Sequence, residues 1–163
     1  RMYELLAWLE DSMLGGALRG AGGWVYGWLN LAHILGIATL FGSVLVLDLR
    51  LLGLFRDSSI EAIARPAVPL AALGFAVAAT SGAAMITFNA SEYAGNPYLY
   101  VKLPAILVGL LNVVVVQRLA AWRHALAGAP LEPGERRALA IGGGCSLVIW
   151  LTVVACGRMI GYW

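Results

Sequence analysis

Four side chains in this 163-residue sequence carry donor atoms suited to a redox cofactor or a soft metal ion, namely His33, Met85, Cys156 and Met159. A neutral imidazole can ligate a metal ion or a haem iron, whereas thioethers and thiols suit Cu(I). Histidine with methionine is also an axial pair for haem. Methionine equally fills gaps in apolar cores, and a free cysteine behaves as a small apolar residue, so packing is the alternative for the sulfur atoms.

His33 is the first candidate ligand. Asn30 stands three residues before it and Gly36 three residues after it, which places all three on adjacent turns of one helical face. Gly36 would leave room for a flat macrocycle beside the imidazole. The alternative is a histidine that hydrogen-bonds to a neighbouring helix. The second histidine, His124, is expected near the opposite face of the membrane, so one haem cannot take both.

Two cations, Lys102 and Arg158, are expected near the outer rim of the membrane, on the side where His33 lies. They could hold carboxylates such as haem propionates, or extend to the lipid headgroups.

Asp48 is expected at the other membrane face, almost opposite Arg50 around the same helix, so its carboxylate needs a cation from another helix. We expect Arg118 or Arg123 to form this structural clasp.

The composition indicates a protein built for lipid. Hydrophobic residues make up 61% and charged residues 12% of the chain, and the mean hydropathy is +0.81. A soluble domain has about 45–50% apolar and about 25% charged residues. The net charge of +2 is too small for a nucleic-acid surface, so nucleic acid is excluded as a partner. Cys145 and Cys156 would lie about 16 Å apart along a helix, too far for a disulfide.

Four apolar stretches are long enough to cross a bilayer, over residues 24–48, 66–88, 98–122 and 138–160. Pro66 suits a first helical turn, and Ser58 with Glu61 forms a capping-box pattern before it. Residues 1–20 have the apolar spacing of an amphipathic helix on the membrane surface. The sequence therefore predicts a single all-α membrane domain over residues 1–163. Its fold would be an N-terminal interfacial helix followed by an up-down bundle of four transmembrane helices, with consecutive spans as antiparallel neighbours.

The basic residues predict the orientation of this bundle, because cytoplasmic loops carry the excess of Lys and Arg. Seven of the eleven basic residues fall on one side: Arg50, Arg56, Arg65, Arg118, Arg123, Arg136 and Arg137. We therefore expect the links at 49–65 and 123–137 in the cytoplasm. The link at 89–97 and both termini would be periplasmic, in a bacterial inner membrane.

No motif for hydrolysis or phosphate binding is present in the spans, so independent catalytic activity is not expected.

Two motifs support a family resemblance: Asn-Leu-Ala-His-Ile-Leu-Gly at residues 30–36 and Leu-Asp-Leu-Arg-Leu-Leu-Gly at residues 47–53. With these motifs the chain resembles a bacterial inner-membrane family of four-span proteins that is catalogued as a domain of unknown function. Members of that family often carry a histidine five residues after the asparagine at Asn112, where this chain has Gln117. The first span is also distantly similar to CopD-type copper-resistance proteins and small b-type cytochromes. That similarity implies a span histidine that binds copper or haem.

Three functional hypotheses follow. In the first, a membrane subunit associated with electron transfer binds haem b near the outer face. His33 would be the axial ligand, Met85 or Met159 a candidate second ligand, and Lys102 with Arg158 the propionate partners. In the second, the soft ligands His33, Met85, Cys156 and Met159 receive copper.

In the third hypothesis, the chain binds no cofactor and serves as a structural or assembly subunit of a larger membrane complex. Asn30, Asp48, Arg50 and Gln117 are assigned structural roles. The expected partners are the lipid bilayer and a membrane or periplasmic protein, or a second copy of this chain.

Overall fold

The computed structural model describes residues 12–20, 22–88, 90–93 and 95–163. These residues form helices and no strand: α2 (Met13–Gly20), α3 (Gly23–Leu51), α4 (Ile60–Phe88), the short 3-10 helix η1 (Ala90–Tyr93), α5 (Pro97–Arg118), α6 (Ala120–Leu126) and α7 (Pro133–Ile160). Helices α3, α4, α5 and α7 are each long and apolar enough to cross a membrane. The predicted all-α fold with four transmembrane helices is therefore confirmed.

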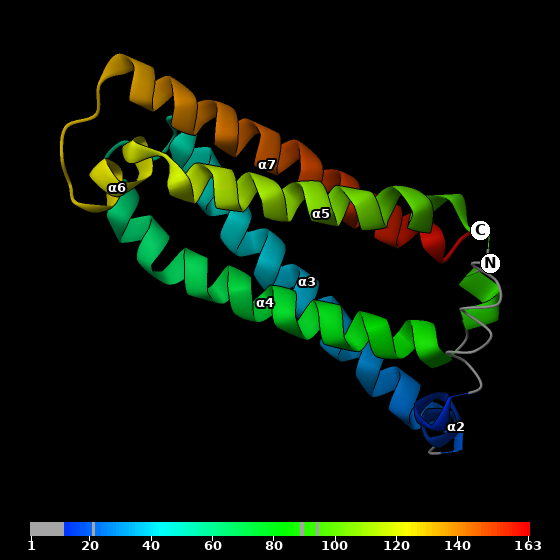
Figure 1. The fold of residues 1–163 in the computed structure, drawn as a ribbon. Helices are drawn as coiled ribbons and strands as arrows, with labels where there is room; N and C mark the ends of the chain where they lie inside the picture. Colours follow the sequence, from blue (N-terminus) through cyan, green and yellow to red (C-terminus); the bar gives the residue numbers. More distant parts are fainter. Residues whose placement is uncertain (1–11, 21, 89, 94) are drawn as a thin grey trace.

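The four long helices alternate in direction and pack as two pairs, α3 with α4 and α5 with α7 (Figure 1). Contacts between α3 and α7 join the pairs. Helices α4 and α5 are consecutive in the chain, yet they make at most a weak contact among the described residues. The expectation that consecutive spans are neighbours is correct for α3 and α4 and wrong for α4 and α5. Most large side chains on the outward faces are exposed, as expected in contact with lipid.

Two glycines bring α3 and α4 into backbone contact. A Cβ atom on Gly36 would lie 2.7 Å from the backbone nitrogen of Ala78, and one on Gly74 would lie 2.5 Å from that of Leu40. Small residues allow such approaches in membranes, where van der Waals contact replaces the hydrophobic effect as the driving force.

The second span begins earlier than predicted. Helix α4 begins at Ile60, so Pro66 and Pro69 lie inside the helix rather than Pro66 in its first turn. The Ser59 hydroxyl accepts a 3.1 Å hydrogen bond from the Ala62 backbone nitrogen. Ser59 therefore caps the helix, where the sequence had predicted Ser58. The reason is burial, because Ile60 and Ala64 belong to the apolar core at this end of the bundle.

The third span ends earlier than predicted. Helix α5 stops at Arg118, and Leu119 takes an extended conformation with φ −64° and ψ 141° before α6 begins. This change of direction puts Trp122 into the same apolar core, which also contains Val116 and Leu139. Residues 120–122 therefore belong to a separate short helix, and Leu119 to the break before it, not to the third span.

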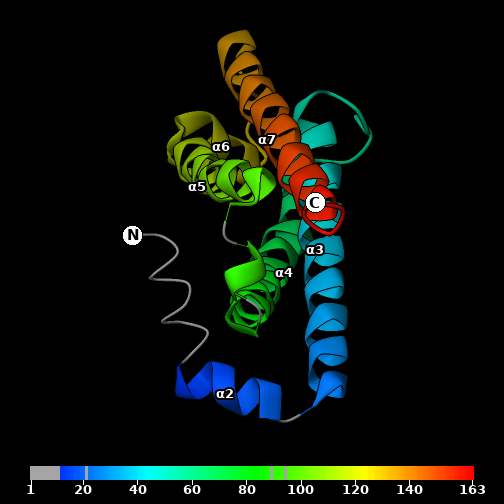
Figure 2. The same ribbon diagram turned by 90° about the vertical axis from the view of Figure 1, so that its right-hand side faces the viewer.

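Helix α2 lies across the end of the bundle where α3 begins (Figure 2). It covers the second part of the predicted interfacial segment, and residues 1–11 of that segment lie outside the described residues. The C-terminal end of α7 lies at the same end of the bundle (Figure 1). The seven arginines at residues 50–65, 118–123 and 136–137 fall at the opposite end, which we call the arginine-rich end.

Candidate functional site

A cavity of about 640 Å³ lies between the four long helices, toward the end of the bundle where α2 lies. We call it the histidine cavity. Four of the residues predicted to bind a cofactor or metal line it, one on each long helix: His33, Met85, Lys102 and Arg158. Asn30, Gly82, Tyr26 and Tyr93 also contribute to its wall. The volume is within the range of about 300–1,000 Å³ that is typical for small-molecule and cofactor sites.

The imidazole of His33 is held in one orientation by α4. Its Nδ1 lies 2.8 Å from the Ala78 carbonyl oxygen and 3.2 Å from the Ser81 hydroxyl. A carbonyl oxygen can only accept, so Nδ1 carries the proton, and in the neutral ring Nε2 keeps its lone pair. Metal-ligating histidines almost always donate their other ring N–H in this way.

Two glycines make room for the side chains of the cavity. A Cβ atom on Gly82 would lie 2.8 Å from His33 Cε1, so the imidazole packs directly on α4. A Cβ atom on Gly157 would lie 3.1 Å from Lys102 Nζ, so the lysine from α5 crosses α7 at this glycine. Both positions depend on the absence of a side chain.

The cationic wall of the histidine cavity has no acidic partner in the described part of the chain. Neither Lys102 nor Arg158 forms an ion pair there. Arg158 instead contacts its own helix end, with a hydrogen bond to the Tyr162 hydroxyl and its guanidinium 4.5 Å from that ring's centre. The charge of this wall suits an anionic group of a ligand.

The remaining predicted ligands lie elsewhere. Cys156 is buried and Met159 is 41% exposed, and neither lines the histidine cavity. Gly36 faces α4, so the space that was expected to admit a macrocycle is filled by the backbone of Ala78. Among the described residues, no group of three or more His, Cys, Asp or Glu side chains is placed to hold a metal ion.

The predicted arginine clasp on Asp48 is not formed. Asp48 is 4% exposed, and the Ser146 side chain on α7 hydrogen-bonds its carboxylate. Arg118 and Arg123 are exposed at the end of α5 and within α6, and they make no ion pair with Asp48 in the described structure. Arg50 donates from Nε to the Ser58 carbonyl at 2.7 Å and so closes the link between α3 and α4.

Asp48 lines a second cavity, of about 280 Å³, in the half of the bundle toward the arginine-rich end. We call it the aspartate cavity. Its polar wall residues are Ser43, Asp48, Asn112, Gln117, Ser146 and Trp150. Asn112 donates from Nδ2 to the Gly142 carbonyl at 3.1 Å, which ties α5 to α7. Gln117, where the family resemblance led us to expect a histidine in other members, lines this cavity and not the one that contains His33.

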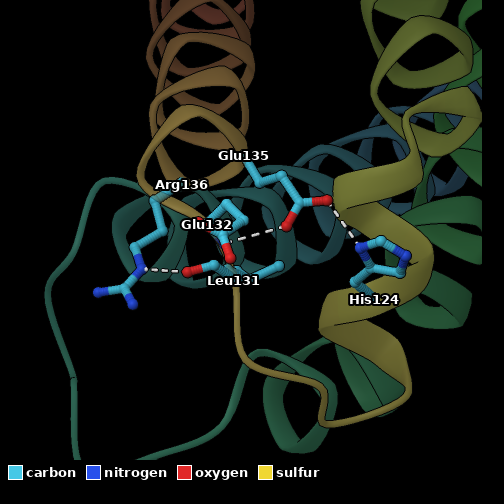
Figure 3. Close-up of polar contacts among 5 residues, drawn as sticks. All are labelled: His124, Leu131, Glu132, Glu135 and Arg136. Carbon is cyan, nitrogen blue, oxygen red and sulfur yellow. Dashed lines mark hydrogen bonds and ion pairs between the residues drawn. The ribbon is translucent and has the colours of Figure 1, made fainter.

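His124 is remote from His33, as expected, and has a structural partner. Its Nδ1 lies 2.7 Å from Glu135 Oε1, while Glu135 Oε2 accepts from the Glu132 backbone nitrogen at 3.1 Å (Figure 3). Arg136 Nε donates to the Leu131 carbonyl at 2.9 Å. The His124–Glu135 contact docks α6 on the first turn of α7 at the arginine-rich end, and the other two bonds close the start of α7.

The sequence analysis did not identify Asn96 as a structural residue. It is 2% exposed, accepts from the Tyr98 backbone nitrogen at 3.0 Å and donates to the Ile160 carbonyl at 3.4 Å. The Asn96-Pro97 dipeptide at the start of α5 is an N-cap signal that predicts the first of these bonds. The bond to the end of α7 depends on the tertiary structure.

Comparison with known proteins identifies a family. A family model described as a family of unknown function, DUF6644, matches residues 5–163. No curated protein and no solved structure matches the chain. Because the model spans nearly the whole sequence, this multi-pass membrane protein belongs to the family of unknown function DUF6644.

Proposed function

We propose that this protein is a bacterial inner-membrane subunit that binds haem b in the histidine cavity and takes part in electron transfer. The observation that carries this proposal is the orientation of His33. Its Nδ1 proton is held by the Ala78 carbonyl, which leaves Nε2 as a free donor atom for iron in a cavity of about 640 Å³.

The charges of the cavity wall support the same ligand. Lys102 and Arg158 lack carboxylate partners in the described structure, and two propionates would supply them. Met85 lines the cavity from α4 and is the candidate second axial ligand in place of Met159, which lies outside it. The protein would hold and orient the cofactor and set the charge around it, while the bound haem would supply the electron-transfer chemistry.

The distribution of the arginines supports a periplasmic position for this site. The seven arginines at one end favour a cytoplasmic position for α6 and the link between α3 and α4. The histidine cavity would then face the periplasm, where a soluble electron-transfer partner could reach it.

Copper binding has less support. His33 and Met85 share the cavity wall, but Cys156 and Met159 do not, so only two of the four soft donors converge. Metal analysis separates the two ligands. Copper retained by the purified protein and lost in His33→Ala would favour copper over haem.

A structural or assembly subunit is the other candidate, and a specific observation favours it. The bonds from His33 to Ala78 and Ser81 tie α3 to α4 without any ligand. Such interhelical bonds contribute about 0.6–2 kcal/mol in membranes. If this is their whole purpose, His33→Gln, which keeps a hydrogen-bonding side chain, will fold and function normally.

The deciding experiment is the absorption spectrum of the full chain, purified from cells supplied with a haem precursor. We expect a Soret band in the wild type and in His124→Ala, which removes the other histidine of the chain. The band should be absent from His33→Ala and His33→Gln, although both should remain in the membrane. A wild-type protein without a Soret band in either redox state would end the haem proposal.

A further inference from the structure

Four arginines line one pocket at the arginine-rich end of the bundle. The pocket has a volume of about 620 Å³ and lies between the link from α3 to α4 and the start of α7. Arg50 belongs to the last turn of α3 and Arg56 to the link after it, while Arg136 and Arg137 belong to the start of α7. We call this site the arginine pocket. It shares no lining residue with the histidine cavity.

The positive charge of the arginine pocket is not balanced by the protein. No Asp or Glu lines the pocket within the described residues, and none of its four arginines forms an ion pair there. Two acidic side chains of this end have other partners, since Glu61 pairs with Arg65 at 3.1 Å and Glu135 with His124 at 2.7 Å. Like charges around one pocket repel one another, so a bound anion would relieve this repulsion.

Three of the four guanidinium groups are already held by backbone carbonyls. Each donates from Nε: Arg50 to Ser58 at 2.7 Å, Arg56 to Gly53 at 2.8 Å and Arg136 to Leu131 at 2.9 Å. The N–H groups on the terminal nitrogens are the donors that remain for a ligand. Phosphate oxygens fit this forked arrangement, and a side chain that is already held loses less freedom on binding. The pocket is therefore suited to phosphate groups.

Exposed apolar side chains beside these arginines indicate which kind of phosphate compound fits. Leu52 lines the pocket, and Leu54 and Phe55 directly precede Arg56 in the link. These three side chains are 41%, 49% and 54% exposed. The pocket lies where helices long enough to cross a membrane end, which is the level of the lipid headgroups. A phospholipid would cover the apolar surface with its acyl chains, and a free phosphate ion would not.

We propose that the arginine pocket binds the headgroup of an anionic phospholipid. The phosphate oxygens accept hydrogen bonds from the terminal nitrogens of the arginines, and the acyl chains lie against Leu52, Leu54 and Phe55. Basic pockets between transmembrane helices suit headgroups that carry more than one phosphate, such as cardiolipin. This inference does not depend on haem binding in the histidine cavity.

The test titrates the full chain in a neutral detergent with tetraoleoyl cardiolipin or dioleoylphosphatidylcholine and counts bound lipid by native mass spectrometry. We expect saturable cardiolipin binding with a Kd about tenfold lower than that of phosphatidylcholine, which has the same acyl chains but no net charge. Inorganic phosphate at millimolar concentration should not displace cardiolipin, because it lacks the acyl chains. This arm distinguishes a lipid headgroup from a free phosphate ion.

A pair of double variants locates the site. Arg56→Gln/Arg137→Gln removes two charges from the pocket and should weaken cardiolipin binding about tenfold. Arg118→Gln/Arg123→Gln is the control, because it removes two exposed charges from the same end at positions that do not line the pocket. The control should bind cardiolipin as the wild type does.

Three results would each overturn the proposal: equal affinity for the two lipids, displacement of cardiolipin by inorganic phosphate, or equal losses in the two double variants. The comparison of the lipids and phosphate on the wild type remains decisive if the pocket variant fails to fold.

Discussion

The imidazole of His33 on α3 packs directly on Gly82 of α4, so close that a Cβ atom at position 82 would lie 2.8 Å from His33 Cε1 and 3.2 Å from Nδ1. This contact and the bond from Nδ1 to the Ala78 carbonyl fix the same ring from two sides. The histidine therefore has its orientation set by α4 and not by its own helix.

Gly82→Ala tests that orientation. The new methyl group should displace the ring and break its bond to Ala78 without adding or removing a polar group. Loss of a bond that orients a metal ligand typically costs about 10–100-fold in affinity. We expect haem retention, measured as the Soret-to-protein absorbance ratio, to fall accordingly while the yield of folded protein is maintained. Full retention of haem would show that the Gly82 contact does not position the ligand.

Gly36→Ala should destabilise the bundle. Its Cβ atom would meet the Ala78 backbone at 2.7 Å, and a backbone atom cannot move aside as a side chain can. Overpacking of this kind costs about 1–3 kcal/mol. The measurement is unfolding in mixed detergent micelles. Gly42→Ala is the matched control on the same helix, because nothing lies within 4 Å of its Cβ position. That variant should be neutral or more stable, and equal losses in both would contradict the close contact.

Trp122→Ala should destabilise the arginine-rich end. Trp122 is 7% exposed and fills the core formed with Leu51, Ile60 and Leu139. Removal of a buried tryptophan side chain costs about 3–5 kcal/mol. Proteolysis of the segment at residues 119–132 in detergent should accelerate, because α6 loses its anchor. Trp163→Ala is the control, since Trp163 is 65% exposed and its removal should change the stability little.

The orientation is tested by single-cysteine labelling of intact spheroplasts, in a chain whose two cysteines have been changed to alanine. Ala129→Cys probes the exposed link between α6 and α7, and Trp163→Cys probes the opposite end. We expect a membrane-impermeant maleimide to label residue 163 and to label residue 129 only after lysis. The reverse pattern would place the histidine cavity at the cytoplasmic face.

The spans were predictable because hydropathy and length identify them directly. The contacts between helices were not predictable from the sequence. These spans are apolar around most of their circumference and carry no amphipathic pattern that points to a neighbour. The break at Leu119 had no proline or glycine to mark it. It follows from the burial of Trp122, a tertiary effect.

The sequence predicted how deep the candidate site residues lie in the membrane, but not the direction in which each side chain points around its helix. Counting residues from the span ends placed His33, Met85, Cys156 and Met159 in the outer half of the membrane, and Lys102 and Arg158 near the same outer rim. The structure finds four of these six around one cavity, namely His33, Met85, Lys102 and Arg158. Cys156 and Met159 stand at a similar level, yet their helix turns them away from it. Gly36 shows the same difficulty, because small residues create space and only the tertiary structure decides whether a ligand or a helix fills it.

The contact between Asp48 and Ser146 has a consequence for biosynthesis. Asp48 is on α3, the first of the four spans to leave the ribosome, and its hydrogen-bonding partner is on α7, the last. During most of translation the carboxylate, which lies in the last turn of α3, lacks that partner. A nascent chain that stops before α7 would leave this carboxylate without Ser146, so the environment of Asp48 is completed only when the last span is in place.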